Sequence, residues 1–582
     1  MSENTEDQTA AEPLLDWLVR PREDAGLHVA EASGWRFASY RDVAGRVRAF
    51  AAGLSARGLP TGTVVSLVCG EPEPFVVSFF GCLLAGMIPS PVMPRNGFRK
   101  ATGYVEHVTR IFAAADPGLV VVGQDSAQLA RQSLALAGVA AEVATVTEVL
   151  RGSAPGQAPQ PAEPAPDRVA LLQFTSGSSG DPKGVRVPWR ALTANILAIR
   201  ERLGLSAADR FAGWLPFFHD MGLIGQILTS VTTPMDLWIL TPEQFIRDPK
   251  RWLECFGRQG ATVTMSPGFG YTYAARRVRS EELAGLDFSG WRVAALGAER
   301  IDPGGVNGFS ELVGPFGFDP GALVDGYGLA EATLAVTGGR PGDGSVLARV
   351  DGTAVEAGRP VGARRDGVLG RDPGSAEHLV SCGRPIGGMS VRILDDAGKP
   401  VPEGCMGEIT VSGASLADGY QLADRRVIDF EPSGHRTGDA GFLYAGELFV
   451  VGRIGDCIKV RGSMVFAEDL EAELESVAGV GRGHVAVLLG RSHGVDRAVA
   501  LVESSSPEGW HDRVLATLQA RTSPQFHCSA RVGRPGTISR TSSGKPRRRV
   551  MWRGFVADEL TGWTTAEPAA AETGADRDRV RA

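Results

Sequence analysis

The sequence predicts an α/β fold: a large N-terminal domain of layered α/β subdomains with a β-rich subdomain, followed by a small α+β C-terminal domain. Three observations predict it. Helical and strand patterns alternate through the first 150 residues, which is typical of a parallel sheet covered by helices. Short strands separated by turn signals follow residue 377, and an amphipathic helix and a further strand follow residue 456. The 582 residues are also too many for one core.

The N-terminal elements come first. Apolar residues at helical spacing predict a helix from Tyr40 that ends at Gly58, and "TVVSLVC" and "GLVVVG" predict buried strands. The long apolar stretch "FVVSFFGCLLAGMIPSPVM" is broken by Gly and Pro, so we interpret it as a buried helix running into a strand, with a membrane span as the alternative. The Pro- and Ala-rich stretch from Gly152 to Asp167 predicts an extended connector.

The later elements set the domain boundaries. The strand "RVALLQF" follows the connector, and the glycine-rich segment from Thr337 to Glu377 predicts an irregular surface insertion. The strands "LVSCGRPI", "SVRILD", "GEITVSG" and "GELFVVGR" then form the β-rich subdomain. The helix "AEDLEAELESV" and the strand "HVAVLLG" belong to the C-terminal domain. We therefore predict a large domain over residues 1–454, a small domain over 455–560 and a disordered tail over 561–582.

Composition limits the function classes. Hydrophobic residues make up 43% and charged residues 22%, as in ordinary globular proteins. The net charge of -7 and the scattered Lys and Arg give no support to a nucleic-acid partner. Seven cysteines form no CxxC pair, and the polar N-terminus is not a secretory signal. We expect a cytoplasmic protein with reduced thiols and no membrane span.

The stretch "TSGSSGDPKG" predicts a phosphate-binding loop. Glycines let backbone N–H groups approach an anion, hydroxyls add donors, and a lysine adds positive charge. A strand precedes the loop, and we expect the helix "WRALTANILAIRERLG" after it to point its N-terminus at the phosphates. A flexible Gly/Ser linker is the alternative. The candidate phosphate-binding residues are Thr175, Ser176, Gly177, Ser178, Ser179, Gly180 and Lys183.

Several further motifs appear with this loop. They are "WLPFFHDMGL", "DGYGLAEATL", "HRTGDAGFLYAGELFVVGRIGDCIKVRG" and "TSSGKPRR". Together, in this order, they resemble the motifs of the adenylate-forming enzymes, and the resemblance spans residues 30 to 560. The combination "LPFFHDMGLIG", "YGLAEATL" and "LVSCGRPI" is most similar to fatty-acyl-AMP ligases, with acyl-CoA synthetases as close relatives.

The resemblance implies a reaction and its partners. Such enzymes join a carboxylic acid, here expected to be hydrophobic, to the α-phosphate of ATP with Mg²⁺, release pyrophosphate, and pass the acyl group to a thiol. An acyl carrier protein is the expected acceptor, and coenzyme A is the first alternative. A nucleotide-binding protein that lacks the adenylating half-reaction is an alternative from another class.

The resemblance also assigns the catalytic residues. Lys545, in "TSSGKPRR", corresponds to the lysine that bridges the carboxylate and the α-phosphate. The alternative is a solvated lysine in a basic tail. Lys183 is then a phosphate clamp. Glu331, in "YGLAE", corresponds to the magnesium ligand, and Mg²⁺ needs few carboxylates beside phosphate and water. A solvated surface Glu is its alternative.

Other motif residues are assigned to the nucleotide. Asp439, in "RTGD", corresponds to the residue that accepts hydrogen bonds from both ribose hydroxyls, and Arg453 is expected to reach ribose or phosphate, with a surface salt bridge as its alternative. Tyr327 is expected to stack near adenine. The remaining candidates around the adenylate are Gly297, Ala298, Glu299, Asp325, Gly326, Gly328 and Leu329.

The resemblance also implies an acyl pocket and a hinge about which the small, mobile C-terminal domain swings. His219 is expected at the pocket mouth, as a gate or carboxylate contact, although a satisfied core histidine is the alternative. Phe218, Met221, Phe269 and Gly297 are pocket candidates, and plain core residues are the alternative for the apolar ones. At the hinge, Gly455 replaces the usual Asp or Lys, and the segment "VRGSMVFAEDLE" departs from the fatty-acyl-AMP-ligase pattern, which leaves the thiol acceptor open.

Overall fold

The chain folds into two compact units. One unit contains the chain up to Val451, and the other begins at Gly452, so the predicted boundary at residues 454 and 455 falls just inside the second unit. The computed structural model describes residues 14–95, 101–123, 126–152, 165–175, 182–350, 358–373, 378–431, 433–460, 463–492, 495–505, 509–522, 526–541 and 544–565. Each unit is described separately below.

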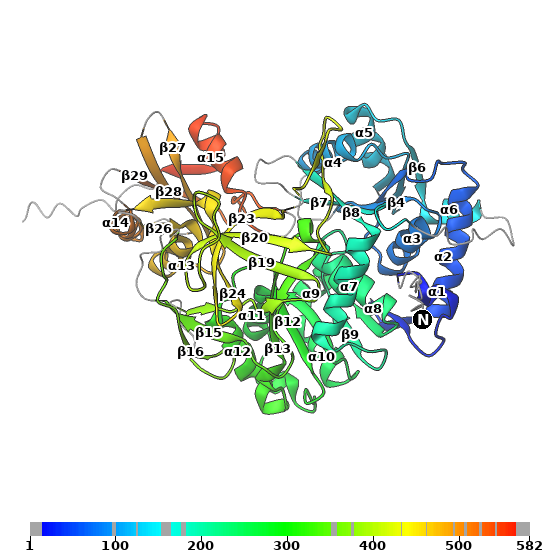
Figure 1. Cartoon of the computed structure of the whole chain (residues 1–582), viewed down its shortest axis with the longest axis horizontal. Helices are drawn as coiled ribbons and strands as arrows, with labels where there is room; N and C mark the ends of the chain where they lie inside the picture. Colours follow the sequence, from blue (N-terminus) through cyan, green and yellow to red (C-terminus); the bar gives the residue numbers. More distant parts are fainter. Residues whose placement is uncertain are drawn as a thin grey trace, which may run out of the picture. The chain divides into compact units, whose positions relative to one another are not determined.

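A nine-stranded sheet forms the centre of the first unit (Figure 1). Its strand order is β18-β14-β13-β12-β11-β9-β10-β1-β2. The run from β13 to β1 is parallel, and both edges are antiparallel. The strands are β1 (Gly26–Glu31), β2 (Gly34–Ser39), β9 (Arg210–Gly213), β10 (Asp236–Ile239), β11 (Val263–Pro267), β12 (Val293–Gly297), β13 (Leu323–Gly328), β14 (Ala335–Gly338) and β18 (Arg384–Pro385).

The order of this sheet creates a topological switch point. After β9 the chain forms β10 on one side, whereas β11 lies on the other side of β9, followed by β12 and β13. In open α/β sheets, ligands bind outside the carboxyl ends of the strands at such a point. The fold alone therefore predicts a ligand site among the residues that follow β9, β11, β12 and β13.

Helices pack on the sheet, and residues of helices, strands and connections share a large buried core. Trp252, Phe256, Trp291 and Phe309 are buried together, and the rings of Phe256 and Trp291 stack with centroids 3.6 Å apart. Such aromatic packing contributes much of the apolar burial. The elements are α1 (Asp16–Val19), α7 (Trp189–Leu203), the π-helix η2 (Met221–Leu228), α8 (Thr229–Thr232), α9 (Pro242–Arg247), α10 (Pro249–Gly257), α11 (Gly268–Arg277), α12 (Pro303–Val313) and the 3₁₀ turns η3 (Ser280–Leu283), η4 (Gly314–Phe316), η5 (Pro320–Ala322) and η6 (Ala330–Ala332).

A second, parallel sheet has the order β4-β3-β5-β6. The predicted helix at Tyr40 and the predicted helix-to-strand passage in "FVVSFFGCLLAGMIPSPVM" are both confirmed, as α2 and as α3 followed by β4. In the described part of the chain, no helix is long and apolar enough to cross a membrane. The elements are α2 (Tyr40–Ser55), β3 (Val64–Val68), α3 (Pro72–Leu84), β4 (Ile88–Pro91), α4 (Ala101–Ala115), β5 (Leu119–Val122), α5 (Ala127–Ala137), β6 (Glu142–Thr145) and α6 (Val146–Arg151).

The strands on either side of the predicted phosphate loop lie in a third sheet, of order β22-β21-β8-β7. The predicted helix is confirmed as α7 (Trp189–Leu203), but a strand that was not predicted separates it from the loop, so its N-terminus does not directly follow the loop. β8 (Lys183–Pro188) follows the loop and pairs antiparallel with β7 (Val169–Thr175), so that Thr175 and Lys183 are opposite each other, and α7 begins only after Pro188. The loop is therefore the connection of a hairpin. The sheet is completed by β21 (Gly419–Gln421) and β22 (Val427–Asp429).

The β-rich part contains two antiparallel sheets. Three of the four predicted strands, "SVRILD", "GEITVSG" and "GELFVVGR", are β19, β20 and β24 of a sheet of order β19-β20-β23-β24, whereas "LVSCGRPI" is divided between β17 and β18, which belong to two other sheets. The segment from Thr337 to Glu377 was expected to be irregular, but its described residues contribute β15 and β16 to a three-stranded sheet, because Leu347 and Leu369 are fully buried. The strands are β15 (Val346–Arg349), β16 (Arg364–Val368), β17 (His378–Val380), β19 (Met389–Leu394), β20 (Gly407–Gly413), β23 (His435–Tyr444) and β24 (Glu447–Arg453).

The second unit has the predicted α+β composition. A hairpin precedes a sheet of order β27-β28-β29-β30, and helices α13 and α14 share a buried core with this sheet. The elements are η7 (Ile454–Asp456), β25 (Cys457–Val460), β26 (Ser463–Phe466), α13 (Ala467–Ala478), β27 (Val485–Ser492), β28 (Val495–Glu503), α14 (His511–Arg521), β29 (His527–Gly533), α15 (Arg548–Val556) and β30 (Trp563–Thr565).

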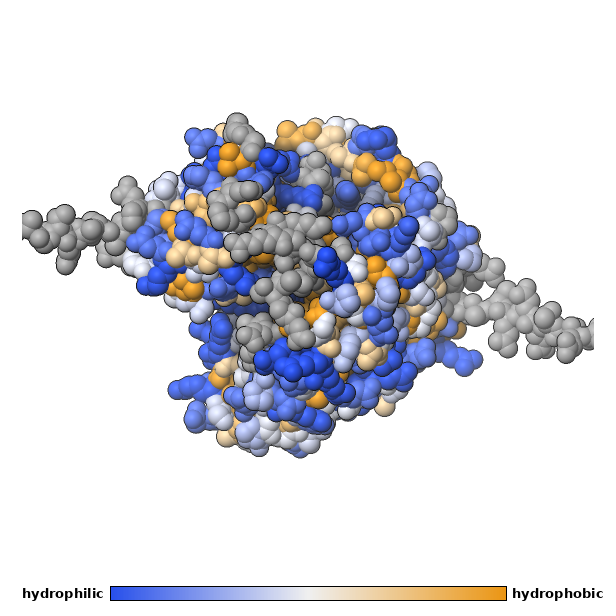
Figure 2. All heavy atoms as spheres, turned by 60° about the vertical axis from the view of Figure 1, so that its left-hand side comes forward, coloured by the Kyte–Doolittle hydropathy of each residue, from blue (hydrophilic) through white to orange (hydrophobic). Residues whose placement is uncertain are grey.

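The disordered tail was predicted to begin too early in the chain. Residues 561–565 do not belong to a disordered segment, because β30 pairs with β29 and Trp563 is buried against Gly533. The rest of the predicted tail, like most of the predicted connector, lies outside the described residues. Figure 2 shows hydrophilic side chains over much of the visible face, with apolar residues in small groups between them.

Candidate active site

Strained and glycine residues gather at the carboxyl ends of β12 and β13. A side chain at Gly297 would approach the carbonyl oxygen of Gly326 to 3.2 Å, and one at Gly328 would overlap the backbone of Leu334. Two non-glycine residues have left-handed φ angles, Ala298 at 66° and Thr333 at 68°. Such strain persists only where the surroundings enforce it, and it is common at functional sites. These predicted adenylate residues therefore lie at the sheet edge where ligands bind.

Glu331 is held in a tight turn after β13. Its backbone carbonyl accepts a hydrogen bond from Ala417 N–H at 2.9 Å, and the hydroxyl of Thr333 donates to the carbonyl of Ser415 at 2.7 Å. The Glu331 carboxylate accepts a hydrogen bond from the hydroxyl of Tyr420 at 2.5 Å. This contact fixes one carboxylate oxygen, Oε1, and leaves Oε2 without a partner among the described residues.

Tyr420 joins this turn to the phosphate hairpin. Its strand, β21, pairs with β8, with Tyr420 opposite Val185. The Nζ atom of Lys183 lies over the Tyr420 ring, 4.8 Å from its centroid, which is a cation–π geometry. Tyr420 was not predicted from the sequence. It belongs to none of the motifs, and only the pairing of β21 with β8 places it at the site. Lys183 and Glu331 are thus connected through one side chain.

Asp439 lies on β23 and contacts a second predicted residue. Its Oδ2 atom accepts a hydrogen bond from the hydroxyl of Tyr327 at 2.6 Å, and its backbone N–H donates to the hydroxyl of Thr437 at 3.1 Å. Only 8% of Asp439 is exposed. The structure therefore brings the predicted adenine residue and the predicted ribose residue into direct contact.

Asp325 is more buried than expected for a residue that lines a polar ligand. Burial raises the pKa of its carboxyl to about 7, although a hydrogen bond from Ser345 acts in the opposite direction. Its Oδ1 atom has no hydrogen-bond partner within the described part of the chain. A buried acceptor of this kind is costly unless a donor reaches it. Asp325 is thus compatible with a donor from a ligand.

Glu299 caps a helix rather than pointing freely into the site. Its Oε1 atom accepts the backbone N–H of Phe269 at 2.7 Å, in the first turn of α11. A carboxylate is favourable there, because the N-terminal amides of a helix carry partial positive charge. Phe269 itself is 42% exposed, so it is a surface residue of the unit and contacts Trp214 edge to face.

His219 precedes the π-helix η2. Its Nδ1 atom lies 2.7 Å from Asp220 Oδ1 and 3.4 Å from the backbone nitrogen of Met221, so both neighbours face the same ring nitrogen. The Asp220 carboxylate also accepts the backbone N–H of Met221 at 2.7 Å. Beside it, the carbonyl of Phe218 accepts a hydrogen bond from Gln173 at 2.8 Å. His219 is thus partly exposed and oriented by a neighbouring acid.

Lys545 lies in the second unit, in a loop shaped like a hairpin. Thr541 N–H donates to the carbonyl of Lys545 at 2.8 Å, and Lys545 N–H donates to the hydroxyl of Thr541 at 3.0 Å. Gly544 has a φ of 85°, a conformation that glycine adopts without strain. The Lys545 side chain is exposed. Arg453, at the end of β24, is also exposed.

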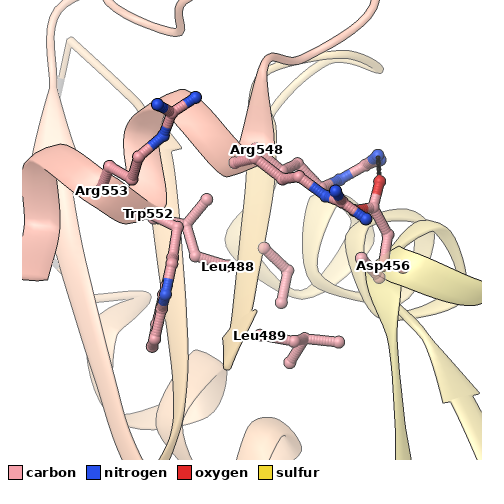
Figure 3. A pocket seen from close by; sticks show the side chains of 10 residues that line it. Asp456, Leu488, Leu489, Arg548, Trp552 and Arg553 are labelled. Carbon is pink, nitrogen blue, oxygen red and sulfur yellow. Dashed lines mark hydrogen bonds and ion pairs between the residues drawn. The ribbon is translucent and has the colours of Figure 1, made fainter. Parts of the chain in front are cut away.

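A pocket of about 450 Å³ lies beside α15 in this second unit (Figure 3). Arg548 lies at one end and pairs with Asp456 at 3.0 Å, Glu468 at 3.0 Å and Glu471 at 2.7 Å. At Gly455, a side chain would overlap the guanidinium of Arg549. The absent side chain at this predicted hinge position therefore makes room for an arginine.

The donor set fits a magnesium ion that is held mainly by phosphate. Among the described residues, no group of three or more His, Cys, Asp and Glu side chains could hold a metal by itself. Magnesium in phosphate-transferring sites uses one or two carboxylates and completes its shell with phosphate oxygens and water. Glu331, with Oε2 available and Oε1 fixed, suits this role. Ser176, Gly177, Ser178, Ser179 and Gly180 lie outside the described residues.

Comparisons with known proteins agree with this geometry. The profile of the family described as "AMP-binding enzyme" matches residues 19–421. The chain belongs to the AMP-binding enzymes. Its identification as an adenylate-forming ligase of the acyl-AMP-ligase and acyl-CoA-synthetase type is confirmed.

Named relatives cover almost the full length. The chain is 30% identical to a medium-chain-fatty-acid–[acyl-carrier-protein] ligase of Moorena producens, over 92% of this chain and 93% of the relative. It is 31% identical to a putative acyl-CoA synthetase of Caulobacter vibrioides, over 87% and 88%.

Solved structures of AMP-binding enzymes share the same fold. A chain from a structural study of fatty acyl-adenylate ligases of E. coli and L. pneumophila matches with a TM-score of 0.83 and 29% identity, over 94% of this chain and 97% of that one. A fatty acyl-adenylate ligase of L. pneumophila in complex with acyl adenylate and pyrophosphate matches with a TM-score of 0.69 and 26% identity, over 95% and 98%.

Proposed function

We propose that this enzyme activates a hydrophobic carboxylic acid with ATP and transfers the acyl group to the phosphopantetheine thiol of an acyl carrier protein. One observation carries the proposal. Around the carboxyl end of β13, a lysine, a glutamate and an aspartate are positioned by two tyrosines, through the contacts Lys183–Tyr420–Glu331 and Tyr327–Asp439. This set provides one group for each part of a nucleotide.

The first step makes a mixed anhydride. A carboxylate oxygen of the acid attacks the α-phosphorus, and the bond from that phosphorus to its bridging oxygen breaks, so that pyrophosphate leaves with the electron pair. In the second step the thiol sulfur, having lost its proton to solvent, attacks the acyl carbon, and AMP leaves with the electrons of the carbon–oxygen bond. Both steps collect negative charge, which fixed positive groups stabilise.

The residues divide this work by position. Lys183 holds the phosphates that leave, and Asp439 binds the ribose hydroxyls while Tyr327 lies beside the base. Glu331 would hold a magnesium ion, which would neutralise phosphate charge when bound. Lys545 contacts the carboxylate and the α-phosphate, which requires its loop to reach the nucleotide during adenylation.

The acid and the acceptor are assigned by analogy. Several relatives are named for fatty acids, which supports a hydrophobic acid, and two are named as ligases of acyl carrier protein, which supports a carrier protein as acceptor. The match to a putative acyl-CoA synthetase favours coenzyme A as the second candidate.

Pyrophosphate exchange tests the first step. The purified enzyme is incubated with ATP, labelled pyrophosphate and a panel of acids that differ in length, branching and ring content. We expect label to enter ATP only with certain acids; no exchange with any acid would contradict the proposal. The exchanging acid is then supplied with carrier protein or with coenzyme A, and efficient thioester formation only with coenzyme A would establish the second candidate.

A further inference from the structure

Gln226 is a fully buried polar residue at the switch point of the large sheet. It lies in the π-helix η2, between β9 and α8, and none of its surface is exposed. Its carboxamide lies against Gly213, the last residue of β9; a side chain there would approach Gln226 Oε1 to 2.3 Å. Only glycine at the end of β9 leaves room for this amide. The pair therefore lies at the carboxyl edge where the fold binds ligands.

The orientation of this amide is fixed by its partner. Leu215 N–H donates a hydrogen bond to Gln226 Oε1 at 3.3 Å. A backbone N–H can only donate, so the atom that faces it must be the oxygen and the other terminal atom must be the NH₂ group. That nitrogen, Nε2, is buried and has no acceptor within the described part of the chain. Buried donors are rarely left unpaired, so an unpaired one calls for an explanation.

Apolar side chains surround the neighbouring position, Gly225. A side chain at Gly225 would lie 2.7 Å from Met265 Sδ and 3.2 Å from Leu334 Cδ2, and Met221 is also close. In a π-helix, hydrogen bonds join residues i and i+5, so Gln226 lies one turn after Met221. Gly225 and Gln226 are consecutive residues of this buried helix, and methionines such as Met221 and Met265 can adapt their shape to a ligand.

We propose that Gln226 selects acids that carry a neutral hydrogen-bond acceptor, such as an oxo, hydroxyl or ether oxygen, in their acyl part. This inference rests on the proposed function and specifies its substrate. A neutral, fully buried amide donor matches a neutral oxygen on a hydrocarbon chain. The charged parts of the reactants have other partners, since Lys183, Glu331 and Asp439 come from other elements of the site.

Such a donor discriminates strongly. A site built to bond a substrate oxygen leaves its own polar group unpaired when the oxygen is absent, and this penalty falls only on the acid that lacks the oxygen. We expect kcat/KM for an oxygenated acid to exceed that of the alkanoate of equal length by on the order of 10- to 100-fold, the effect of leaving one buried donor unpaired. The advantage should be greatest at one position of the oxygen along the chain.

The test measures adenylation of matched pairs of acids. Each pair consists of an alkanoate and its oxo or hydroxy analogue, with the oxygen moved along the chain, and the readout is the ratio of their kcat/KM values. Gln226→Met keeps a similar volume but removes the donor, and we expect it to bring the ratio close to one by lowering turnover of the oxygenated acid. Gly213→Ala, which displaces the carboxamide, is a second variant with the same expected loss of preference.

Ser230→Ala is the matched control. The Ser230 hydroxyl is also buried and without a partner among the described residues, one turn along from Gln226, so an internal water could join the two. Under our proposal Ser230→Ala leaves the ratio unchanged. A purely structural role for Gln226 would change both acids of a pair by the same factor, and this result would overturn the inference.

The outcomes separate the inference from the function on which it rests. Equal use of both acids of every pair by the unmodified enzyme overturns the inference and leaves the proposed function intact. Absence of exchange with every acid overturns the proposed function, and the inference with it. A ratio well above one that falls in Gln226→Met and in Gly213→Ala supports both.

Discussion

The hydroxyl of Tyr420 donates a hydrogen bond to Glu331 at 2.5 Å, while its ring lies 4.8 Å from the Lys183 ammonium. The Tyr420 side chain thus positions both Glu331, the carboxylate that suits magnesium, and Lys183, the positive charge that suits the departing phosphates. The two functions of Tyr420 are chemically separable, because the hydroxyl serves Glu331 and the ring serves Lys183.

Tyr420→Phe should therefore affect only the Glu331 contact. We expect kcat/KM for adenylation to fall about 10- to 100-fold, because a hydrogen bond to a charged group contributes about 1.5–3 kcal/mol. The Mg²⁺ concentration that gives half-maximal rate should rise, as measured by pyrophosphate exchange. Tyr420→Leu removes the ring as well and should also weaken ATP binding. The control is Tyr444→Phe, and an equal loss in that variant would contradict the assignment.

Tyr420 also shows where sequence reasoning ends. The motifs predicted Glu331, Asp439, Tyr327 and Lys183, because each belongs to a short pattern with its own chemistry. Tyr420 belongs to no pattern, and its position depends on the pairing of β21 with β8. Pairing between distant strands is set by tertiary packing, which local periodicity does not encode.

Individual elements were predicted best where apolar periodicity was long. The helix at Tyr40 and the buried helix α3 are present as predicted, because burial on one or all faces determines them. The hairpin strand β8 was not predicted. Its six residues include only two buried valines, at alternate positions, and they lie beside a glycine and a proline, which are typical of loops. Similarly, the burial of Trp563 was not predicted, because the residues that follow it are polar and Ala-rich and are typical of a disordered tail.

Lys545→Ala should separate the two half-reactions. The lysine charge is needed where the carboxylate meets the α-phosphate, so we expect adenylation to fall by about 10²- to 10³-fold. Thioester formation from supplied acyl-adenylate should be largely unchanged, because that step has already passed the phosphoryl transfer. Arg534→Ala, an exposed basic residue of the same unit, is the control. Equal loss of both half-reactions in Lys545→Ala would count against this role.

Arg548 and Arg549 are adjacent but should respond differently to loss of charge. Arg548 contacts three carboxylates and is mostly buried, so Arg548→Met leaves these acids unpaired and should destabilise the second unit by about 3–5 kcal/mol. Arg549 is exposed, and Arg549→Met should change stability by less than about 0.5 kcal/mol. Hydrogen exchange of the β27 and β28 amides measures both. Similar protection in the two variants would show that the cluster does not stabilise the unit.

Asp325 should make the stability of the first unit depend on pH. Burial raises the pKa of its carboxyl from 3.8 to about 7, so the folded state holds a proton that the unfolded state releases. The corresponding stabilisation is complete below about pH 3.8 and is lost as the pH rises through 7. From pH 5 to pH 8 the loss should be roughly 2–3 kcal/mol.

Asp325→Asn removes this titration and keeps the size of the side chain. Relative to the unmodified enzyme, the variant should therefore be more stable at pH 8 than at pH 5, because only the unmodified enzyme has to bury a carboxylate at the higher pH. Thermal denaturation midpoints of both proteins at the two pH values give the comparison. The difference between the two proteins, and not either midpoint alone, carries the prediction, because other groups titrate equally in both. A difference that is the same at pH 5 and pH 8 would mean that Asp325 keeps an ordinary pKa in the folded protein.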